Sequence, residues 1–150
     1  MNIYLASDHR GFKLKNFLLT RILNSGYLAT DLGTYKYKKD DDYPDFAKLA
    51  AFEISKNPKN KRGIVICGSG VGVDVTVNRF PKVRSVLGFS VKQVKASRAD
   101  DDVNILSLAA DYIKQEEAWR LVKVFLQTNF KNKLKYQRRI NKIDKILIHR

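Results

Sequence analysis

The chain has 150 residues, 44% of them hydrophobic and 29% charged, and its formal net charge is +14 at pH 7. A domain of this length buries roughly 68–70% of its unfolded surface, so it needs neither disulfides nor a structural metal to fold. The lone cysteine cannot form an internal disulfide, no secretory-type segment opens the chain, and the apolar runs are far shorter than the roughly 20 residues of a membrane helix. We expect one cytoplasmic domain over residues 1–150, with no membrane partner.

Five short apolar segments alternate with amphipathic stretches, and this alternation predicts parallel βαβ units. The expected strands are Ile3–Ala6, Leu28–Leu32, Gly63–Cys67, Ser85–Phe89 and Asn104–Leu108. Apolar residues at helical spacing predict helices over Phe12–Leu23, Phe46–Ile54, Val71–Asn78, Val91–Ser97 and Trp119–Leu126. We therefore predict an α/β fold, a Rossmann-like three-layer αβα sandwich with a five-stranded parallel sheet.

The C-terminal segment, from about residue 130 to 150, predicts a further helix. Its apolar residues recur at spacings of three and four: Tyr136, Ile140, Ile143 and Leu147. Residues 129–150 also hold eight Lys and Arg residues against one acid, which is half of the net charge. Such a cluster can neutralise the phosphates of a nucleic acid, but Lys is abundant along the whole chain, so the charge is equally consistent with composition alone.

The loop after the first strand, Ser7–Gly11, places an acid, an imidazole and a guanidinium at one strand end. In open parallel sheets, ligands bind beyond the carboxyl ends of the strands. The alternative is an ordinary turn in which Ser7 or Asp8 caps the following helix.

The loop after the third strand, Cys67–Gly72, has three glycines in five positions. Glycines let the backbone approach a ligand closely and aim several N–H groups at an anion. The loop lacks the Lys-Ser/Thr ending of a P-loop, and a glycine-rich turn by itself also suits close packing.

Cys67 ends the predicted strand and faces the start of the next helix. A lone cysteine is commonly a small buried apolar residue. At a helix N-terminus, however, positive potential favours the thiolate, which can act as a base. The acid and imidazole of the neighbouring turn favour this second interpretation.

The motifs Asp8-His9-x-Gly11-Phe12, Asp42-Tyr43-Pro44, Cys67-Gly68-Ser69-Gly70-Val71-Gly72 and Ser97-Arg98 occur in this order. In these motifs the chain resembles the ribose-5-phosphate isomerase B family, nearly from end to end. The resemblance implies an aldose–ketose isomerase that interconverts ribose 5-phosphate and ribulose 5-phosphate, with a phosphorylated sugar as ligand. It implies no metal, no nicotinamide and no other cofactor.

The resemblance also implies roles for single residues. Cys67 takes a proton from carbon 2 of the open-chain sugar, and Ser69 moves a proton between the sugar oxygens. Backbone N–H groups hold the enediolate, as in an oxyanion hole. The implied substrate-binding residues are Asp8 and Tyr43 for the sugar, His9 for the phosphate, and Gly68, Gly70, Val71 and Gly72 for the enediolate.

One departure from the family lies at residues 97–104. The family pattern Ser-Arg-x-His-Asn-Asp-x-Asn is here Ser97-Arg98-Ala99-Asp100-Asp101-Asp102-Val103-Asn104, so Asp100 stands where a histidine opens the sugar ring. An isolated aspartate is ionised at neutral pH and seldom donates a proton. Repulsion from Asp101 and Asp102, with burial, would raise its pKa, whereas a solvated acidic loop would not.

The other departures concern the phosphate. Asp111 stands where the family often has an arginine, and Lys135 replaces another arginine, keeping the charge without the bidentate fork. Arg139 matches. In this family the segment often reaches a neighbouring subunit, so we expect a homodimer or dimer of dimers in which the C-terminal helix packs on the partner.

Two other functions remain open from the sequence. The altered positions suit a different pentose or a hexose phosphate, as in galactose-6-phosphate isomerase. Alternatively, the chain is a non-catalytic relative whose basic surface binds nucleic acid or a protein. The complete glycine loop argues against lost activity, and a nucleic-acid partner is not expected.

Overall fold

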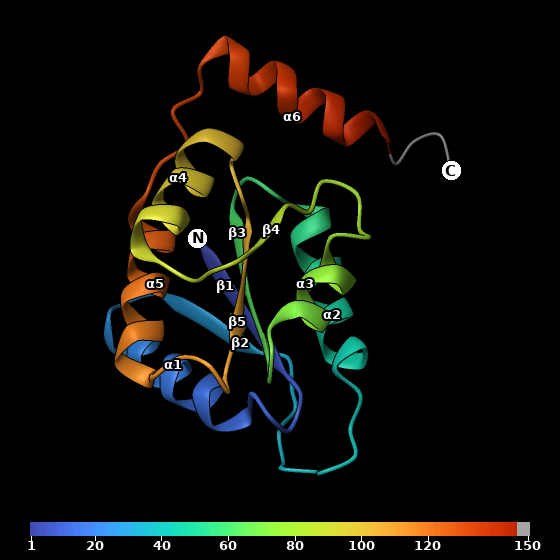
Figure 1. Ribbon diagram of the computed structural model, residues 1–150, viewed down its shortest axis with the longest axis vertical. Helices are drawn as coiled ribbons and strands as arrows, with labels where there is room; N and C mark the ends of the chain where they lie inside the picture. The colour runs from blue at the N-terminus through green and yellow to red at the C-terminus, as the bar shows by residue number, and fades with distance from the viewer. Residues whose placement is uncertain (147–150) are drawn as a thin grey trace.

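The computed structural model describes residues 1–146, and Figure 1 shows its layers. One all-parallel sheet has the strand order β2-β1-β3-β5-β4. The strands are β1 (Asn2–Ser7), β2 (Leu28–Asp31), β3 (Lys61–Cys67), β4 (Ser85–Leu87) and β5 (Ile105–Ala109). The five predicted strands are confirmed, with small shifts at their ends.

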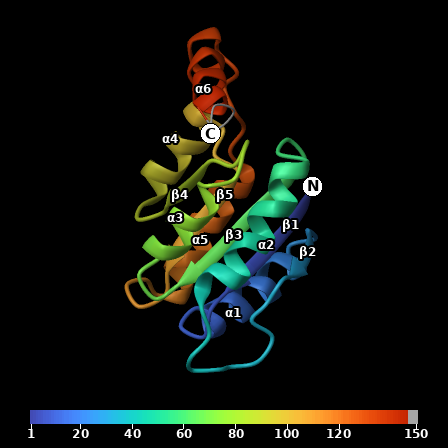
Figure 2. The ribbon, with the colours of Figure 1, turned by 90° about the vertical axis from the view of Figure 1, so that its right-hand side faces the viewer.

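Helices cover both faces of this sheet, as Figures 1 and 2 show. One face packs against α1 (Phe12–Asn24), α4 (Val91–Asp101) and α5 (Gln115–Gln127), and the other against α2 (Tyr43–Lys56) and α3 (Val71–Val77). The final helix, α6 (Leu134–Ile146), lies beyond the end of α4. The predicted three-layer αβα sandwich and its C-terminal helix are confirmed.

Strand β3 carries the core on both of its faces. Because successive side chains of a strand point to opposite faces, Ile64 and Ile66 pack into the cluster under α1 and α5, while Val65 and Cys67 pack into the cluster under α2 and α3. The side chain of Cys67 therefore points toward α2 and α3, at the carboxyl end of the strand.

The buried face of α2 differs from the sequence prediction. Among the apolar residues whose spacing predicted this helix, Ala50 and Ile54 are buried but Leu49 is 42% exposed, and Ala47 and Ala51 are buried in its place. Small alanine side chains let α2 approach the sheet and α3 closely, so close packing outweighs the burial of a larger leucine.

Helix α4 is longer than predicted, since it continues to Asp101 and takes up two of the three consecutive aspartates. Arg98 donates to the carboxylate of Asp102 at 2.8 Å, and Lys131 donates to Asp100 at 2.8 Å. These cations offset the repulsion among the three carboxylates, so neither the raised pKa nor the solvated loop considered from the sequence describes this segment. The acidic run is thus the end of a helix.

Helix α6 lies at the amino-terminal edge of the sheet, opposite the carboxyl ends of the strands (Figure 1). Tyr136 is 8% exposed, whereas Ile143 is 45% exposed and Ile146 is 64% exposed. The predicted position Leu147 lies outside the described residues. Among residues 1–146, no helix has the length and apolar character needed to cross a membrane.

Candidate active site

A pocket of about 280 Å³ opens at the carboxyl ends of β1 and β3. Its wall is formed by the last residue of β3, by the loops that follow both strands, and by the first residues of α2 and α3. The lining residues are Asp8, Arg10, Tyr43, Cys67, Gly68, Ser69, Val71 and Gly72. One chain therefore brings together seven of the residues that the sequence proposed for the site, plus Arg10.

Cys67 is the last residue of β3 and is only 4% exposed. It packs with the apolar cluster beneath α2 and α3 and also lines the pocket. The thiol is thus both a core residue and part of the pocket wall, which keeps it away from bulk solvent while leaving it in reach of a ligand.

The glycine loop turns sharply between Cys67 and α3. Gly70 has φ +73°, and a Cβ there would lie 3.0 Å from the backbone N of Ala109, so only glycine fits without strain. The N–H of Val71 donates to Ser69 Oγ at 3.4 Å. Within residues 1–146 the N–H groups of Gly70 and Gly72 have no hydrogen-bond partner, as expected for the first turn of a helix. Gly72 lines the pocket and its N–H can serve a ligand, whereas Gly70 is buried and is not one of the lining residues.

Tyr43 begins α2 and closes one side of the pocket. A Cβ on Gly72 would lie 2.5 Å from Cζ of the Tyr43 ring, so the ring rests directly against the glycine backbone. The absence of a side chain at residue 72 therefore positions the phenol over the start of α3.

Asp8 follows β1 and is 4% exposed. Burial raises the pKa of Asp8, while the hydrogen bond from the Gly11 N–H, at 3.0 Å, and the charge of His9 oppose this rise. This hydrogen bond closes the turn before α1, but it does not cap the helix, because the N-cap residue is Gly11 and no side chain caps it. The residue nevertheless also lines the pocket.

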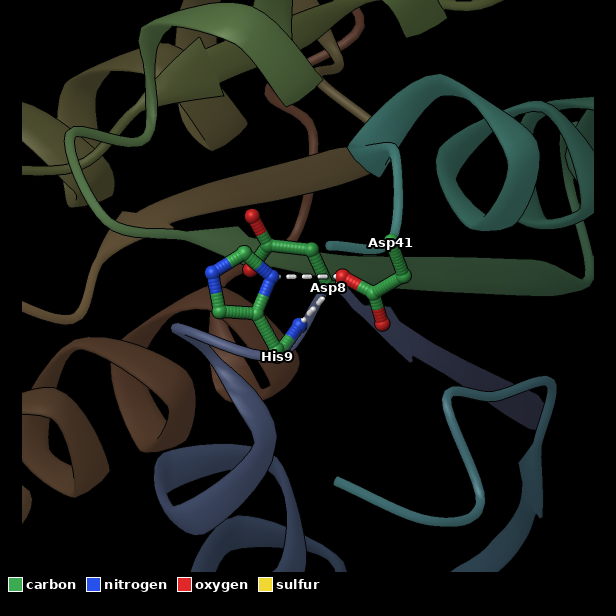
Figure 3. A group of neighbouring side chains, drawn as sticks. All are labelled: Asp8, His9 and Asp41. Atoms are coloured by element: carbon green, nitrogen blue, oxygen red, sulfur yellow. Dashed lines mark hydrogen bonds and ion pairs between the residues drawn. The ribbon is translucent and has the colours of Figure 1, made fainter. Parts of the chain in front are cut away.

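His9 lies beside the pocket and is held by Asp41 (Figure 3). Asp41 Oδ1 accepts the backbone N–H of His9 at 2.9 Å and lies 2.6 Å from Nδ1. Asp8, His9 and Asp41 offer three atoms within 4.8 Å of one another that could ligate a metal ion. Because the His9 ring is already bonded to Asp41, the group is better described as a hydrogen-bonded pair beside Asp8.

Arg10 and Asp41 are not among the site residues predicted from the sequence. Arg10 lines the pocket and forms an ion pair with Asp111, which follows β5. Arg10 could have been proposed from the sequence, because it lies in the same turn as Asp8 and His9. No sequence pattern pointed to Asp41, because its contact with His9 spans 32 residues.

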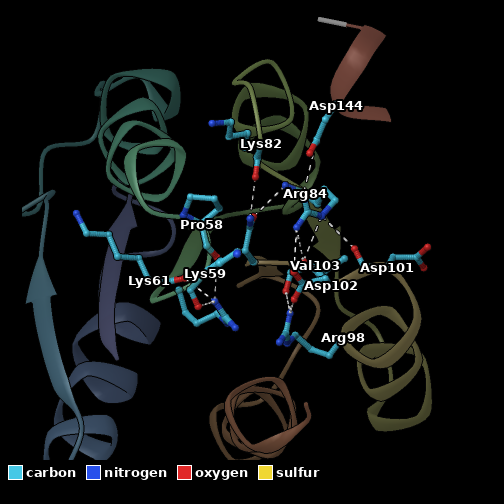
Figure 4. Close-up of polar contacts among 12 residues, drawn as sticks. Pro58, Lys59, Lys61, Lys82, Arg84, Arg98, Asp101, Asp102, Val103 and Asp144 are labelled. Atoms are coloured by element: carbon cyan, nitrogen blue, oxygen red, sulfur yellow. Dashed lines mark hydrogen bonds and ion pairs between the residues drawn. The ribbon is translucent and has the colours of Figure 1, made fainter. Parts of the chain in front are cut away.

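Asp100 and Asp101 lie at the C-terminal end of α4, at the opposite edge of the sheet from Cys67. Figure 4 shows the adjoining network, in which Arg84 donates to the backbone oxygens of Asp101 and Asp102. The hydrogen bond from Lys131 lowers the pKa of Asp100, so the carboxyl is ionised rather than primed to donate a proton. Within one chain, these residues are not part of the Cys67 pocket.

Lys135 and Arg139 are exposed on α6, at the same edge as Asp100. The ammonium of Lys135 lies 4.9 Å from the centre of the Tyr136 ring. The candidate residues therefore form two groups at opposite edges of the sheet. The Cys67 pocket holds one group, and the second comprises Asp100, Asp101, Lys135 and Arg139.

Comparisons with known proteins agree with this fold. The family model described as Ribose/Galactose Isomerase matches residues 3–143. A relative from Mycoplasma genitalium named probable ribose-5-phosphate isomerase B is 38% identical over 95% of this chain and 93% of its own length. One from Mycolicibacterium paratuberculosis, named ribose-5-phosphate isomerase B, is 33% identical over 94% of this chain and 88% of its own.

Two solved structures show the same architecture. Ribose-5-phosphate isomerase B from Mycoplasma genitalium with bound ribulose-5-phosphate has a TM-score of 0.93 and 37% identity, and covers 97% of this chain and 95% of its own. The ribose 5-phosphate isomerase from Thermotoga maritima has a TM-score of 0.90 and 35% identity, over 96% of this chain and 97% of its own. Together with the pocket geometry, these matches show that the chain belongs to the ribose/galactose isomerase family.

Proposed function

We propose that this chain interconverts ribose 5-phosphate and ribulose 5-phosphate, with Cys67 as the base. The observation that carries this proposal is the buried thiol in the wall of a pocket whose glycine loop offers unpaired N–H groups. Support also comes from relatives that carry the name of this isomerase and from the neighbour with bound ribulose-5-phosphate.

In the proposed mechanism, the Cys67 thiolate removes the proton from carbon 2 of the open-chain aldose. The C2–H electron pair forms the C1–C2 double bond, and the carbonyl oxygen on carbon 1 becomes an enediolate oxygen. The N–H of Gly72, with the rest of the Gly68–Gly72 backbone, holds this oxygen; in proteases a comparable donor stabilises the transition state by about 2.7–4 kcal/mol. The thiol then returns its proton to carbon 1, which gives the ketose.

The oxygen atoms also exchange a proton. The hydroxyl on carbon 2 loses its proton as its carbon becomes the ketone, and the oxygen on carbon 1 gains one. Ser69 Oγ belongs to the same pocket wall and relays this proton in the proposal. Asp8 and Tyr43, which also line the pocket, bind sugar hydroxyls in the proposal.

We also propose that the site is completed by a second copy of the chain in a homodimer. A two-fold dimer can bring the amino-terminal edge of one copy, with Asp100, Asp101, Lys135 and Arg139, onto the carboxyl-end pocket of the other. Support comes from the exposed isoleucines of α6 and from a cavity of about 460 Å³ that they line. One sheet with one core on each face supports a single domain, and the lone reduced cysteine suits the cytoplasm.

The test is formation of ribulose 5-phosphate from ribose 5-phosphate by the purified wild type and by Cys67→Ala. The proposal predicts turnover by the wild type and loss of roughly 10²–10⁴-fold in the variant, the usual contribution of a general base. Thermal unfolding of both proteins controls for folding. Full activity of Cys67→Ala would contradict the assignment of Cys67 as the base. Faster turnover of galactose 6-phosphate than of ribose 5-phosphate by the wild type would contradict the assignment of the substrate.

A further inference from the structure

Arg10 occupies a distinctive place in the pocket. Its guanidinium lies directly over the backbone of Gly68, where a Cβ would collide with Cζ, Nε and Nη2 of the arginine. Gly68 is therefore the residue that admits Arg10 to the pocket. Among the eight residues of the pocket wall, Arg10 is the only lysine or arginine.

Asp111 holds the guanidinium in this place. Nη2 of Arg10 donates to Oδ2 of Asp111, and the backbone N–H of Asp111 donates to the Gly68 carbonyl at 3.0 Å. The carboxylate is thus fixed to the same glycine loop that the guanidinium covers. Within residues 1–146, Asp111 is the only hydrogen-bond partner of this side chain, which leaves most of its five N–H donors free.

The Arg10–Asp111 pair is exposed enough to exchange partners. The side chain of Arg10 is 53% exposed and that of Asp111 is 39% exposed. Ion pairs in contact with solvent contribute little stability, because water and salt screen them. A phosphate, by contrast, accepts two parallel N–H bonds from one guanidinium, which makes it the stronger ligand.

The negative charges in the pocket favour a cation at the position of Arg10. Asp8 lies in the wall, Cys67 becomes negative when it acts as the base, and the phosphate of a sugar brings nearly two further negative charges at neutral pH. Asp111, chiefly through its hydrogen bond, raises the pKa of Arg10, and the charges of Asp8 and Cys67 add to this effect. The guanidinium is therefore charged whenever substrate arrives.

We propose that Arg10 binds the phosphate group of the substrate, and that Asp111 holds the guanidinium over Gly68 while the pocket is empty. This inference rests on the proposed function, because it assigns the anionic end of that substrate. In the proposed mechanism the enediolate is served by the N–H of Gly72, at the start of α3, whereas Arg10 covers the loop before it turns into the helix. The two negative ends of the substrate thus have separate partners.

The test measures binding of inorganic phosphate by calorimetry, together with KM and kcat for ribose 5-phosphate. Arg10→Gln is expected to weaken phosphate binding and to raise KM at least about tenfold, because it removes at least one charge-assisted hydrogen bond. The change in kcat should be smaller. The phosphate affinity and KM of Arg10→Lys should lie between those of the wild type and those of Arg10→Gln, because lysine keeps the charge but not the two-pronged donor geometry of the guanidinium. Asp111→Asn should bind phosphate as tightly as the wild type or more tightly, since it removes the competing anion.

Arg120→Gln is the matched control, because it removes the same charge from an exposed position on α5 without touching the pocket. Unchanged phosphate affinity in Arg10→Gln would overturn the assignment. Weakening in Asp111→Asn as severe as in Arg10→Gln would overturn the role of Asp111. Phosphate binding is measured without turnover, so a wild type that fails to isomerise ribose 5-phosphate would contradict the proposed function separately.

Discussion

The carboxylate of Asp41 fixes His9 twice with one oxygen atom: Oδ1 accepts the backbone N–H at 2.9 Å and lies 2.6 Å from Nδ1 of the ring. The side chain of Asp41 is only 7% exposed, so this pair is shielded from water. With Nδ1 bonded to a carboxylate, Nε2 is the nitrogen left for a ligand. The loop before α2 therefore orients the imidazole beside the pocket.

Replacing Asp41 tests this orientation. Asp41→Ala leaves the His9 backbone N–H without its acceptor, so we expect a loss of about 1–3 kcal/mol in the free energy of unfolding and a higher KM for ribose 5-phosphate. Asp41→Asn keeps an acceptor at the same place, so its loss of stability and its rise in KM should both be smaller. Urea unfolding and steady-state kinetics provide the measurements. Equal losses in the two variants would mean that the hydrogen bonds to His9 do not matter.

Gly72→Ala is expected to lower activity without lowering stability. The new Cβ would meet the Tyr43 ring at 2.5 Å and displace it, and such a displacement in an active site can reduce kcat/KM by roughly 10²-fold. Alanine favours a helix over glycine by about 1 kcal/mol, so α3 should not unfold more easily. The control is the double variant Tyr43→Ala/Gly72→Ala, which should match Tyr43→Ala. A lower kcat/KM in the double variant than in Tyr43→Ala would mean that displacement of the Tyr43 ring does not explain the effect of Gly72→Ala.

The raised pKa of Asp8 predicts a specific pH dependence of stability. A carboxyl whose folded pKa exceeds its unfolded value binds more protons in the native state between these values. Its contribution to the free energy of unfolding therefore falls as the pH rises through that window, above the ordinary value of 3.8. Asp8→Asn should remove this fall, so its stability relative to the wild type should increase as the pH rises above the ordinary value of 3.8. Urea unfolding curves that keep a constant separation across this range would argue against a raised pKa.

The strands and the main catalytic candidate could be predicted from the sequence because their signals are local. Apolar runs mark β1 and β3, and the glycines after Cys67 mark a turn at a strand end. Since parallel strands place their carboxyl ends at one edge, Asp8 and Cys67 were expected together, and they share one pocket.

What the sequence could not provide depends on contacts between distant residues. Asp41 meets His9 across 32 residues and Arg10 meets Asp111 across 101, and no local pattern encodes either pair. The burial of Ala47 and Ala51 in α2 was missed because apolar periodicity favoured the larger Leu49. The helical end at Asp100 depends on Lys131, which comes from a later loop.

Mixing two inactive variants tests the proposed sharing of the site between subunits. Cys67→Ala disables the pocket and Arg139→Ala disables the opposite edge, so a mixed dimer holds one site with both groups intact. Unfolding and refolding an equal mixture should restore about a quarter of the wild-type sites, since half of the dimers are mixed and each holds one complete site. Each variant refolded alone is the control. Activity that stays at the level of the controls would contradict a shared site.

The central claim, that Cys67 moves the proton at carbon 2, is tested most directly by exchange of substrate hydrogen with solvent deuterium. Nuclear magnetic resonance of ribose 5-phosphate in heavy water should show label entering the substrate with the wild type and not with Cys67→Ala. Binding of ribose 5-phosphate to the variant by calorimetry confirms that the pocket is intact. Exchange at the wild-type rate in Cys67→Ala would contradict the account, because another group would then be the base.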